Sequence, residues 1–257
     1  MDAPDFSLKD KLALITGSTQ GLGFAIAQAY VACGARVIIN GRSEQRVTDA
    51  INRLAGPGLA AAHPLVMDIG QLHELEAGYG QVCKKWGTPD ILVNNVGIRI
   101  RKSLEQISLD EILELIHTDM VAGTQLSRLA AQAMVKTSSS GRIITLTSVA
   151  GQLARPGDGV YPVAKQGLTG LVRALAVEYG PHGITSNGIA SGTFATETNQ
   201  AIADDPNTGP AVAMRNPLRR WGQPNDITGA AVFLASPSAS YVNGHVLVVD
   251  GGLSVMF

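Results

Sequence analysis

A tyrosine and a lysine at helical spacing are the side chains of this sequence best suited to proton transfer. Tyr161 and Lys165 stand four residues apart, and residues at that spacing share one face of a helix, with their Cβ atoms about 5–6 Å apart. Pro162 predicts that Tyr161 lies at the mouth of the helix, because proline is tolerated in the first helical turn. A free tyrosine has a pKa of about 10 and is a poor base at neutral pH. The adjacent ammonium favours the phenolate, so Tyr161 is a candidate general base or acid.

Ser148 precedes this pair by thirteen residues and directly follows an apolar run that predicts a strand. Its hydroxyl could donate a hydrogen bond to a substrate oxygen and stabilise negative charge that develops there. Pairs of tyrosine and lysine at this spacing also occur by chance on helices. These three residues therefore need support from the rest of the chain.

A glycine-rich turn, Thr16–Gly23, predicts a phosphate-binding site. Glycines after a strand permit a tight turn, and they let the backbone approach a pyrophosphate at the N-terminus of the next helix. Their order here is T-G-x-x-x-G-x-G rather than G-x-G-x-x-G. The alternative reading is an ordinary strand-to-helix turn closed by three glycines.

Short β-rich runs alternate with longer helical patterns along the whole chain, which is typical of stacked βαβ units. We predict strands at Leu12–Ile15, Arg36–Asn40, Pro64–Met67, Ile91–Val93, Arg142–Thr147, Thr185–Ile189 and His245–Val249. We predict helices at Leu22–Cys33, Glu44–Leu54, Leu72–Trp86, Leu109–Met134, Pro162–Tyr179 and Asp226–Ala235. The expected fold class is α/β: a Rossmann-type, doubly wound, seven-stranded parallel sheet with helices on both faces. Ligands bind outside the carboxyl ends of the strands in such sheets.

The length of 257 residues fits either two small domains or one large one. No linker interrupts the alternating pattern, so we expect residues 1–257 to form a single domain, with residues 193–217 as a mobile flap.

Composition excludes several function classes. Hydrophobic residues make up 45% of the chain, and 20 Lys and Arg nearly cancel 21 Asp and Glu, which argues against disorder, nucleic-acid binding and membrane-surface binding. The N-terminal ten residues do not resemble a signal peptide, and no apolar run reaches the roughly 20 residues of a membrane span. Two cysteines cannot form a disulfide framework. We expect a cytoplasmic protein without a metal, because the five histidines lack ligand spacing.

Taken together, the glycine turn, the serine after the fifth strand and the tyrosine–lysine helix resemble the short-chain dehydrogenase/reductase family. The resemblance extends from Leu8 to Gly252 and includes Asn94–Gly97, Asn187–Gly192 and Val249–Gly252. It implies an oxidoreductase that interconverts a secondary alcohol and a ketone by hydride transfer. The catalytic residues that it implies are Ser148, Tyr161, Lys165 and Asp119.

The resemblance also implies a nicotinamide cofactor. The residues implied to hold it are Gly17, Ser18, Gln20, Gly21, Leu22, Gly23, Arg42, Asp68, Asn95, Gly97, Tyr161, Lys165, Ile189 and Thr196. Gly41 occupies the position where an acid would bind a ribose 2′-hydroxyl, and Arg42 beside it can bind a phosphate, so we expect NADP(H) in preference to NAD(H). Alternatively, Arg42 begins a solvated helix face with Arg46, and Asp68 caps the helix near Leu72.

Asp119 departs from the family pattern, which has an asparagine there. In the family, the main-chain carbonyl of that asparagine holds a water that relays protons to the lysine. An aspartate of the same size could serve this role, but its charge could instead perturb Lys165.

Several segments resemble the gluconate 5-dehydrogenase branch of the family: Asn40–Arg42, Gly97–Arg101, Leu153–Gly157, Thr193–Glu197 and Arg220–Gln223. Arg101 and Arg155 match basic positions at the cleft of those enzymes, and a guanidinium suits a sugar-acid carboxylate. Both arginines could instead be solvated or serve subunit contacts. The expected reaction converts D-gluconate and 5-keto-D-gluconate.

Other functions remain open at this point. Within enzymes, the alternatives are a broad carbonyl reductase and a 3-oxoacyl thioester reductase. A non-catalytic, cofactor-sensing protein is the alternative from a different class. The family's counterparts of the two longest predicted helices pack into dimers and tetramers, so the resemblance implies a homotetramer.

Overall fold

A seven-stranded parallel sheet forms the centre of the protein. The computed structural model describes residues 3–56, 61–138 and 140–256, and its strands run in the order β3-β2-β1-β4-β5-β6-β7. Their bounds are β1 Leu12–Ile15, β2 Arg36–Gly41, β3 Ala62–Val66, β4 Ile91–Asn94, β5 Arg142–Ser148, β6 Thr185–Ser191 and β7 Val246–Val249. The predicted doubly wound sheet is confirmed.

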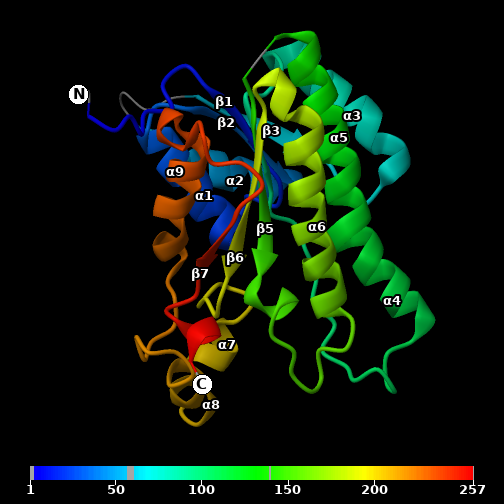
Figure 1. Cartoon of the computed structure of the whole chain (residues 1–257), viewed down its shortest axis with the longest axis vertical. Coiled ribbons are helices and arrows are strands. Elements are labelled where there is room, and N and C mark those ends of the chain that lie inside the picture. The colour runs from blue at the N-terminus through cyan, green and yellow to red at the C-terminus, as the bar shows by residue number, and fades with distance from the viewer. Residues whose placement is uncertain (1–2, 57–60, 139, 257) are drawn as a thin grey trace.

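Helices cover both faces of the sheet, as Figure 1 shows. One face carries α1 Gly21–Ala32, α2 Glu44–Leu54 and α9 Thr228–Ala235. The other face carries α3 Leu72–Trp86, α5 Ala122–Lys136 and α6 Tyr161–Tyr179.

The strand β1 is apolar along its whole length because both of its faces are buried. In β1, Ala13 and Ile15 pack into the core on the side of α1, whereas Leu12 and Leu14 pack on the side of α3 and α5. This alternation follows from the two-residue period of a strand. Sheets buried on both faces are therefore built from continuous apolar runs.

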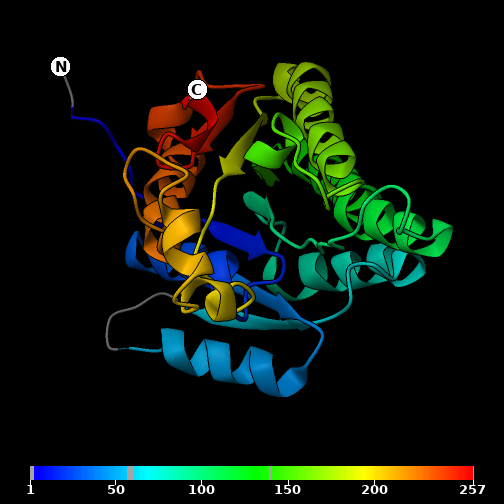
Figure 2. The ribbon, with the colours of Figure 1, turned by 90° about the horizontal axis from the view of Figure 1, so that it is seen from below.

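The strand order reverses between β1 and β4, which creates a crevice at the carboxyl ends of these strands. The view from below in Figure 2 looks onto this end of the molecule, where the connections after the strands gather. Two short helices lie at the same end, α7 Gln200–Ala203 and α8 Thr208–Ala213. They occupy the segment 193–217, which we predicted only as a mobile flap.

The predicted helix Leu109–Met134 is interrupted, which corrects the sequence interpretation. It consists of α4 Leu109–Ile116, a π-helical turn η1 His117–Val121, and α5. A π turn inserts one extra residue and commonly occurs at functional sites. Asp119 lies in this turn.

The remaining elements are short 3₁₀ turns: η2 Val149–Gly151, η3 Gly180–His182, η4 Pro224–Ile227, η5 Pro237–Ala239 and η6 Leu253–Val255. The turn η4 takes the place of the predicted start of the last helix at Asp226. Among the described residues, no helix combines the length and the apolar character that crossing a bilayer requires.

Candidate active site

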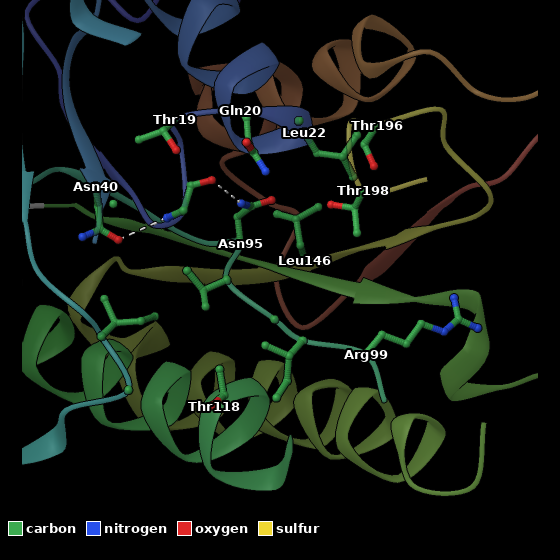
Figure 3. A pocket seen from close by; sticks show the side chains of 18 of the residues that line it. Thr19, Gln20, Leu22, Asn40, Asn95, Arg99, Thr118, Leu146, Thr196 and Thr198 are labelled. Atoms are coloured by element: carbon green, nitrogen blue, oxygen red, sulfur yellow. Dashed lines mark hydrogen bonds between the residues drawn. The ribbon is translucent and has the colours of Figure 1, made fainter. Parts of the chain in front are cut away.

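A cleft of about 1060 Å³ lies over the carboxyl ends of the strands. Most of the predicted site residues line it: Gly17, Gln20, Gly21, Leu22, Arg42, Asp68, Asn95, Gly97, Arg101, Ser148, Tyr161, Lys165 and Thr196. In Figure 3, Thr19, Gln20 and Leu22 lie on one side of the cleft with Thr196 and Thr198, and Thr118 and Arg99 lie on the opposite side. The cleft is therefore the place where residues from both halves of the chain meet.

Five predicted site residues are not on the wall of this cleft, of which Arg155 lines a smaller cavity beside it. Ser18, Asp119 and Ile189 are buried, and Gly23 lies in α1 behind the turn. Ser18 Oγ donates a hydrogen bond to Ile15 O at 2.7 Å and accepts one from Asn40 N at 3.0 Å. Ser18 therefore stabilises the glycine turn from within.

The glycine turn is shaped to bring backbone close to a ligand. Gly17 and Gly21 have φ angles of +59° and +60°, values that glycine adopts most easily. Gly17 N donates to Asn40 Oδ1 at 3.1 Å, and Asn95 Nδ2 donates to Gly17 O at 3.1 Å, as Figure 3 shows. A Cβ added to Gly23 would lie 2.6 Å from Asn95 Nδ2, so a glycine is needed where α1 meets the turn.

The N-terminus of α1 is suited to an anion. Gln20 occupies its N-cap position without a side-chain cap, and the first turn of α1 contains no acidic residue. The first amide groups of a helix have no partner within the helix, and they carry partial positive charge. The turn therefore fits the pyrophosphate of a dinucleotide.

Arg42, which directly follows β2, lines the cleft. Its side chain is 81% exposed, and its Nη1 lies 3.9 Å from Asp68 Oδ2. A Cβ on the adjacent Gly41 would lie only 2.7 Å from Thr19 Cγ2, so an acidic residue at position 41 would require a rearrangement. Arg42 precedes α2, which Ser43 caps by accepting a hydrogen bond from Arg46 N. Both arginines line the cleft.

Asp68 does not cap α3. The N-cap position of that helix is Gln71, and Asp68 Oδ1 instead accepts a hydrogen bond from Gly70 N at 2.9 Å. The alternative reading of Asp68 as a helix cap is therefore wrong.

The predicted reacting residues come together at the other end of the cleft. Ser148 ends β5, Tyr161 begins α6 with Pro162 directly after it, and Lys165 follows one turn later. Ser148 Oγ accepts a hydrogen bond from Ala150 N at 3.1 Å and donates one to Ser191 O at 3.4 Å. Lys165 Nζ lies 5.5 Å from the centroid of the Tyr161 ring. This geometry brings an ammonium close to a phenol at the mouth of a helix.

Lys165 forms a buried ion pair with Asp119. The distance from Lys165 Nζ to Asp119 Oδ2 is 3.0 Å. Burial acts to lower the pKa of Lys165, but attraction to Tyr161 and Asp119 outweighs it and raises that pKa above its ordinary value. Lys165 is therefore a cation at neutral pH.

Arg99 also faces the reacting residues, and the sequence interpretation did not single it out. Its guanidinium lies 4.7 Å from the centroid of the Tyr161 ring, and its Nε donates to Asp158 Oδ1 at 2.9 Å. Its place two residues after Gly97 could have drawn attention to it. Its partner Asp158, 59 positions away, carried no comparable signal.

Asp158 joins two arginines beneath the cleft. It accepts hydrogen bonds from Arg99 and from Arg155 Nε, the latter at 2.6 Å. Burial acts to raise the pKa of Asp158, but the hydrogen bonds and charges of the two arginines lower it further than burial raises it.

The two arginines predicted to bind substrate occupy different positions. Arg155 is not on the wall of the large cleft; it lines a smaller adjacent cavity of about 130 Å³, while Arg101 lines both. Arg101 Nη2 donates to Asn199 Oδ1 at 3.3 Å. Burial, together with repulsion from Arg99 and Arg155, lowers the pKa of Arg101.

Metal-ligating groups do not gather in the part of the chain that the structure describes, where no set of three or more His, Cys, Asp or Glu residues could hold a metal ion. Cys33 and Cys83 are free thiols.

The parallel sheet, the glycine turn at its crevice and the tyrosine–lysine helix beside it define a nicotinamide-dependent oxidoreductase fold. Residues 17–254 match the sequence model of the family adh_short_C2, described as "Enoyl-(Acyl carrier protein) reductase". The chain belongs to the short-chain dehydrogenase/reductase family. Proteins of this family act on hydroxyl and keto groups with a nicotinamide cofactor.

Individual relatives match the chain over nearly its full length. Gluconate 5-dehydrogenase of Gluconobacter oxydans (strain 621H) is 36% identical over 99% of both chains. The 3-oxoacyl-[acyl-carrier-protein] reductase FabG of Salmonella typhimurium is also 36% identical, over 96% of this chain and 98% of its own. The crystal structure of a gluconate 5-dehydrogenase from Burkholderia cenocepacia J2315, in complex with NADP and tartrate, superimposes with a TM-score of 0.93 at 34% identity, covering 99% of both chains.

Proposed function

We propose that the protein is an NADP-preferring dehydrogenase that interconverts a secondary hydroxyl and a ketone on a sugar acid, D-gluconate and 5-keto-D-gluconate. The observation that carries this proposal is the charge beside Ser148. Among the described residues that line the smaller cavity are four arginines and one aspartate: Arg99, Arg101, Arg155, Arg215 and Asp158. This excess of positive charge favours a substrate with a carboxylate.

Arg101 is the arginine we assign to the carboxylate. The guanidinium groups of Arg99 and Arg155 are held by Asp158, whereas Arg101 contacts the neutral Asn199 and lines both cavities. A guanidinium can bind a carboxylate through two parallel hydrogen bonds. The Burkholderia enzyme was crystallised with tartrate, a hydroxy acid, which supports an anionic substrate here.

Tyr161, Ser148 and Lys165 supply the proton chemistry in this proposal. In alcohol oxidation, Tyr161 takes the proton of the substrate hydroxyl; in ketone reduction, it returns a proton to the carbonyl oxygen. Ser148 donates a hydrogen bond to the same oxygen, where negative charge develops. Lys165 favours the phenolate form of Tyr161 and holds the cofactor ribose. When bound, the nicotinamide accepts or donates the hydride at the substrate carbon.

NADP preference rests on the region around Arg42. Arg42 and Arg46 place two guanidinium groups at this end of the cleft, and Gly41 puts no carboxylate at the position where an acid would repel a 2′-phosphate. The NADP in the Burkholderia structure supports the same preference.

The proposal also includes the oligomeric state and the cellular location of the protein. Exposed apolar side chains occur on α4 and α6, including Leu109, Leu113, Val163 and Val177. Such surfaces favour subunit contacts, and we propose a homotetramer in the cytoplasm. A monomeric mass in solution would contradict the tetramer.

A second candidate is reduction of a 3-oxoacyl thioester, which the Salmonella relative favours because it is equally identical to this chain. A panel separates the candidates: gluconate, a 3-oxoacyl thioester and simple ketones are assayed with each cofactor by absorbance of the reduced nicotinamide. We expect turnover with sugar acids and NADP. Turnover confined to the thioester would favour the second candidate. Cofactor binding without any turnover would indicate a cofactor-sensing protein.

Two variants test whether Arg101 binds the carboxylate of the substrate. Arg101→Ala should raise the KM for gluconate by about 10-fold or more and leave that for a simple ketone nearly unchanged. Arg36→Ala is the matched control, because Arg36 begins β2 at the opposite end of the sheet from the cleft. An equal effect of Arg101→Ala on both substrates would contradict a role in carboxylate binding.

A further inference from the structure

The carboxylate of Asp119 is buried and engaged through both of its oxygens. The side chain has no exposed surface, and Oδ2 lies 3.0 Å from Lys165 Nζ. The other oxygen, Oδ1, accepts a hydrogen bond from Ile98 N at 2.6 Å. Asp119 thus joins η1 both to α6 and to the segment after β4.

This ion pair lies at the wall of the cleft. A Cβ added to Gly97 would lie 2.9 Å from Asp119 Oδ2 and 2.9 Å from Lys165 Nζ. Gly97 and Lys165 both line the cleft, so the pair borders the ligand space, with the carboxylate of Asp119 buried behind Lys165 and Gly97. Charges in such a water-poor place interact more strongly than charges in bulk water.

The charged groups around Tyr161 come from four segments: α6, the segment after β4, η1 and the loop between η2 and α6. Lys165 of α6 and Arg99 of the segment after β4 lie over its ring, and Arg101 of the same segment lines the same cleft. Asp119 of η1 partners Lys165, and Asp158 partners Arg99. The two cations nearest the Tyr161 ring therefore each have a buried carboxylate partner.

A carboxylate beside Lys165 opposes the effect that Lys165 has on Tyr161. A cation near a phenol favours the phenolate, and an anion near that cation offsets part of its field. A neutral asparagine at position 119 would leave the ammonium charge without this offset. The side chain at position 119 therefore affects how readily Tyr161 gives up its proton.

We propose that Asp119 is a positioning residue that offsets the charge of Lys165 and keeps Tyr161 in its proton-donating form to higher pH than a neutral side chain would. This inference rests on the proposed function, in which Tyr161 exchanges the proton with the substrate. The offset of the Lys165 charge by Asp119 favours ketone reduction at neutral pH and shifts alcohol oxidation to more alkaline pH.

Asp119→Asn tests the charge separately from the hydrogen bond. Asparagine has the size of aspartate and keeps an oxygen that can accept from Ile98 N, but it carries no charge. The pH at which kcat/KM for alcohol oxidation is half-maximal should fall by about one unit. Asp119→Ser, which is also neutral and keeps an acceptor oxygen, should shift the profile in the same direction and provides a second variant if the first folds poorly.

A spectroscopic measurement tests the inference without turnover. The ultraviolet absorbance band of tyrosinate is titrated in the cofactor-free protein, and the signal of the matching Tyr161→Phe protein is subtracted to isolate Tyr161. In Asp119→Asn, this band should appear at lower pH than in the unmodified chain. If the unmodified chain turns over none of the substrates in the panel, the proposed function is overturned. The titration still tests the effect of Asp119, because it requires no turnover.

Asp90→Asn is the matched control. Asp90 also accepts a backbone hydrogen bond, from Leu12 N, and its Oδ1 lies 3.8 Å from Lys11 Nζ, but it lies at the amino end of the sheet. We expect no shift of either profile in this variant. Unshifted profiles in Asp119→Asn and Asp119→Ser, with a loss of stability in Asp119→Ala, would show that Asp119 is structural only and would overturn the inference.

Discussion

Tyr161 is the residue on which the proposed chemistry depends. It begins α6, and its ring lies near two cations, Lys165 and Arg99. A tyrosine in this place can exchange a proton with a substrate oxygen in the cleft, while the buried Lys165 remains charged. Replacing Tyr161 by phenylalanine removes only the hydroxyl, so this variant tests proton transfer separately from ligand binding.

Tyr161→Phe should lower kcat by about 10²–10⁴-fold, the usual contribution of a general acid or base. Cofactor affinity should change little, because the glycine turn and Arg42 are untouched. Steady-state kinetics and a fluorescence titration with NADPH measure the two effects. Retained turnover in this variant would remove Tyr161 from the proposed mechanism.

Arg42→Ala should lower the selectivity for NADP over NAD by about 10-fold, or about 1.4 kcal/mol. The exposure of Arg42 limits the effect, because water competes with the phosphate. The ratio of kcat/KM with the two cofactors measures it, with Arg36→Ala as the control. An unchanged ratio would leave Arg42 as a solvated residue, the alternative reading of the sequence.

At the scale of elements, the site depends on connections between loops that are distant in the sequence. Asp158, in the loop between η2 and α6, binds Arg99 of the loop after β4 and Arg155 of its own loop. The side chain of Asp158 is only 2% exposed, whereas those of Arg99 and Arg155 are 30% and 41% exposed. The aspartate is thus the buried centre of a cluster whose arginines reach solvent.

Asp158→Asn should lower the free energy of unfolding by about 1–3 kcal/mol at pH 7, less than for a fully buried pair because both arginines can be solvated. The lowered pKa of Asp158 implies that its stabilising contribution is present above the unfolded value of about 3.9 and is lost as the pH falls through the folded pKa. Urea unfolding of both proteins at pH 7 and in acid measures this. If the difference in unfolding free energy between the two proteins stays constant from pH 7 into strong acid, the ionised form of Asp158 is not the source of the stabilisation.

The elements set by local signals match the sequence interpretation best. The helices α2 and α3 have the predicted bounds, because a capping serine, a regular apolar spacing and a following glycine or turn act over a few residues. The π turn η1 and the helices α7 and α8 were missed. Short elements of this kind depend on tertiary contacts more than on their own residues.

At the scale of the whole molecule, the cleft combines the turn after β1 with residues after β5 and β6. This supports the proposal of one domain, since neither half of the chain contains the complete site. The sheet also continues through all seven strands without a break. Binding in the cleft should therefore stabilise the whole chain.

NADP at 100 times its Kd should stabilise the folded chain by about 2.7 kcal/mol, which corresponds to a rise in Tm of about 5–10 °C for a domain of this size. Differential scanning calorimetry should show one transition that moves as a unit. NAD at the same concentration should give a smaller rise. Two transitions, of which only one moves with NADP, would contradict the single domain.

The sequence by itself determined the class of fold, the family and a part of the residues that line the cleft. These depend on local patterns: the strand–helix alternation, the glycine turn and the spacing of Tyr161 and Lys165 are all read within short stretches of chain. Only the tertiary structure decided the pairing of Lys165 with Asp119, the positions of Arg99 and Arg155 around Asp158, and the burial of Ser18 and Ile189. The physical reason is that charge pairing and burial arise between segments far apart in sequence, and spacing along the chain does not encode which of them meet.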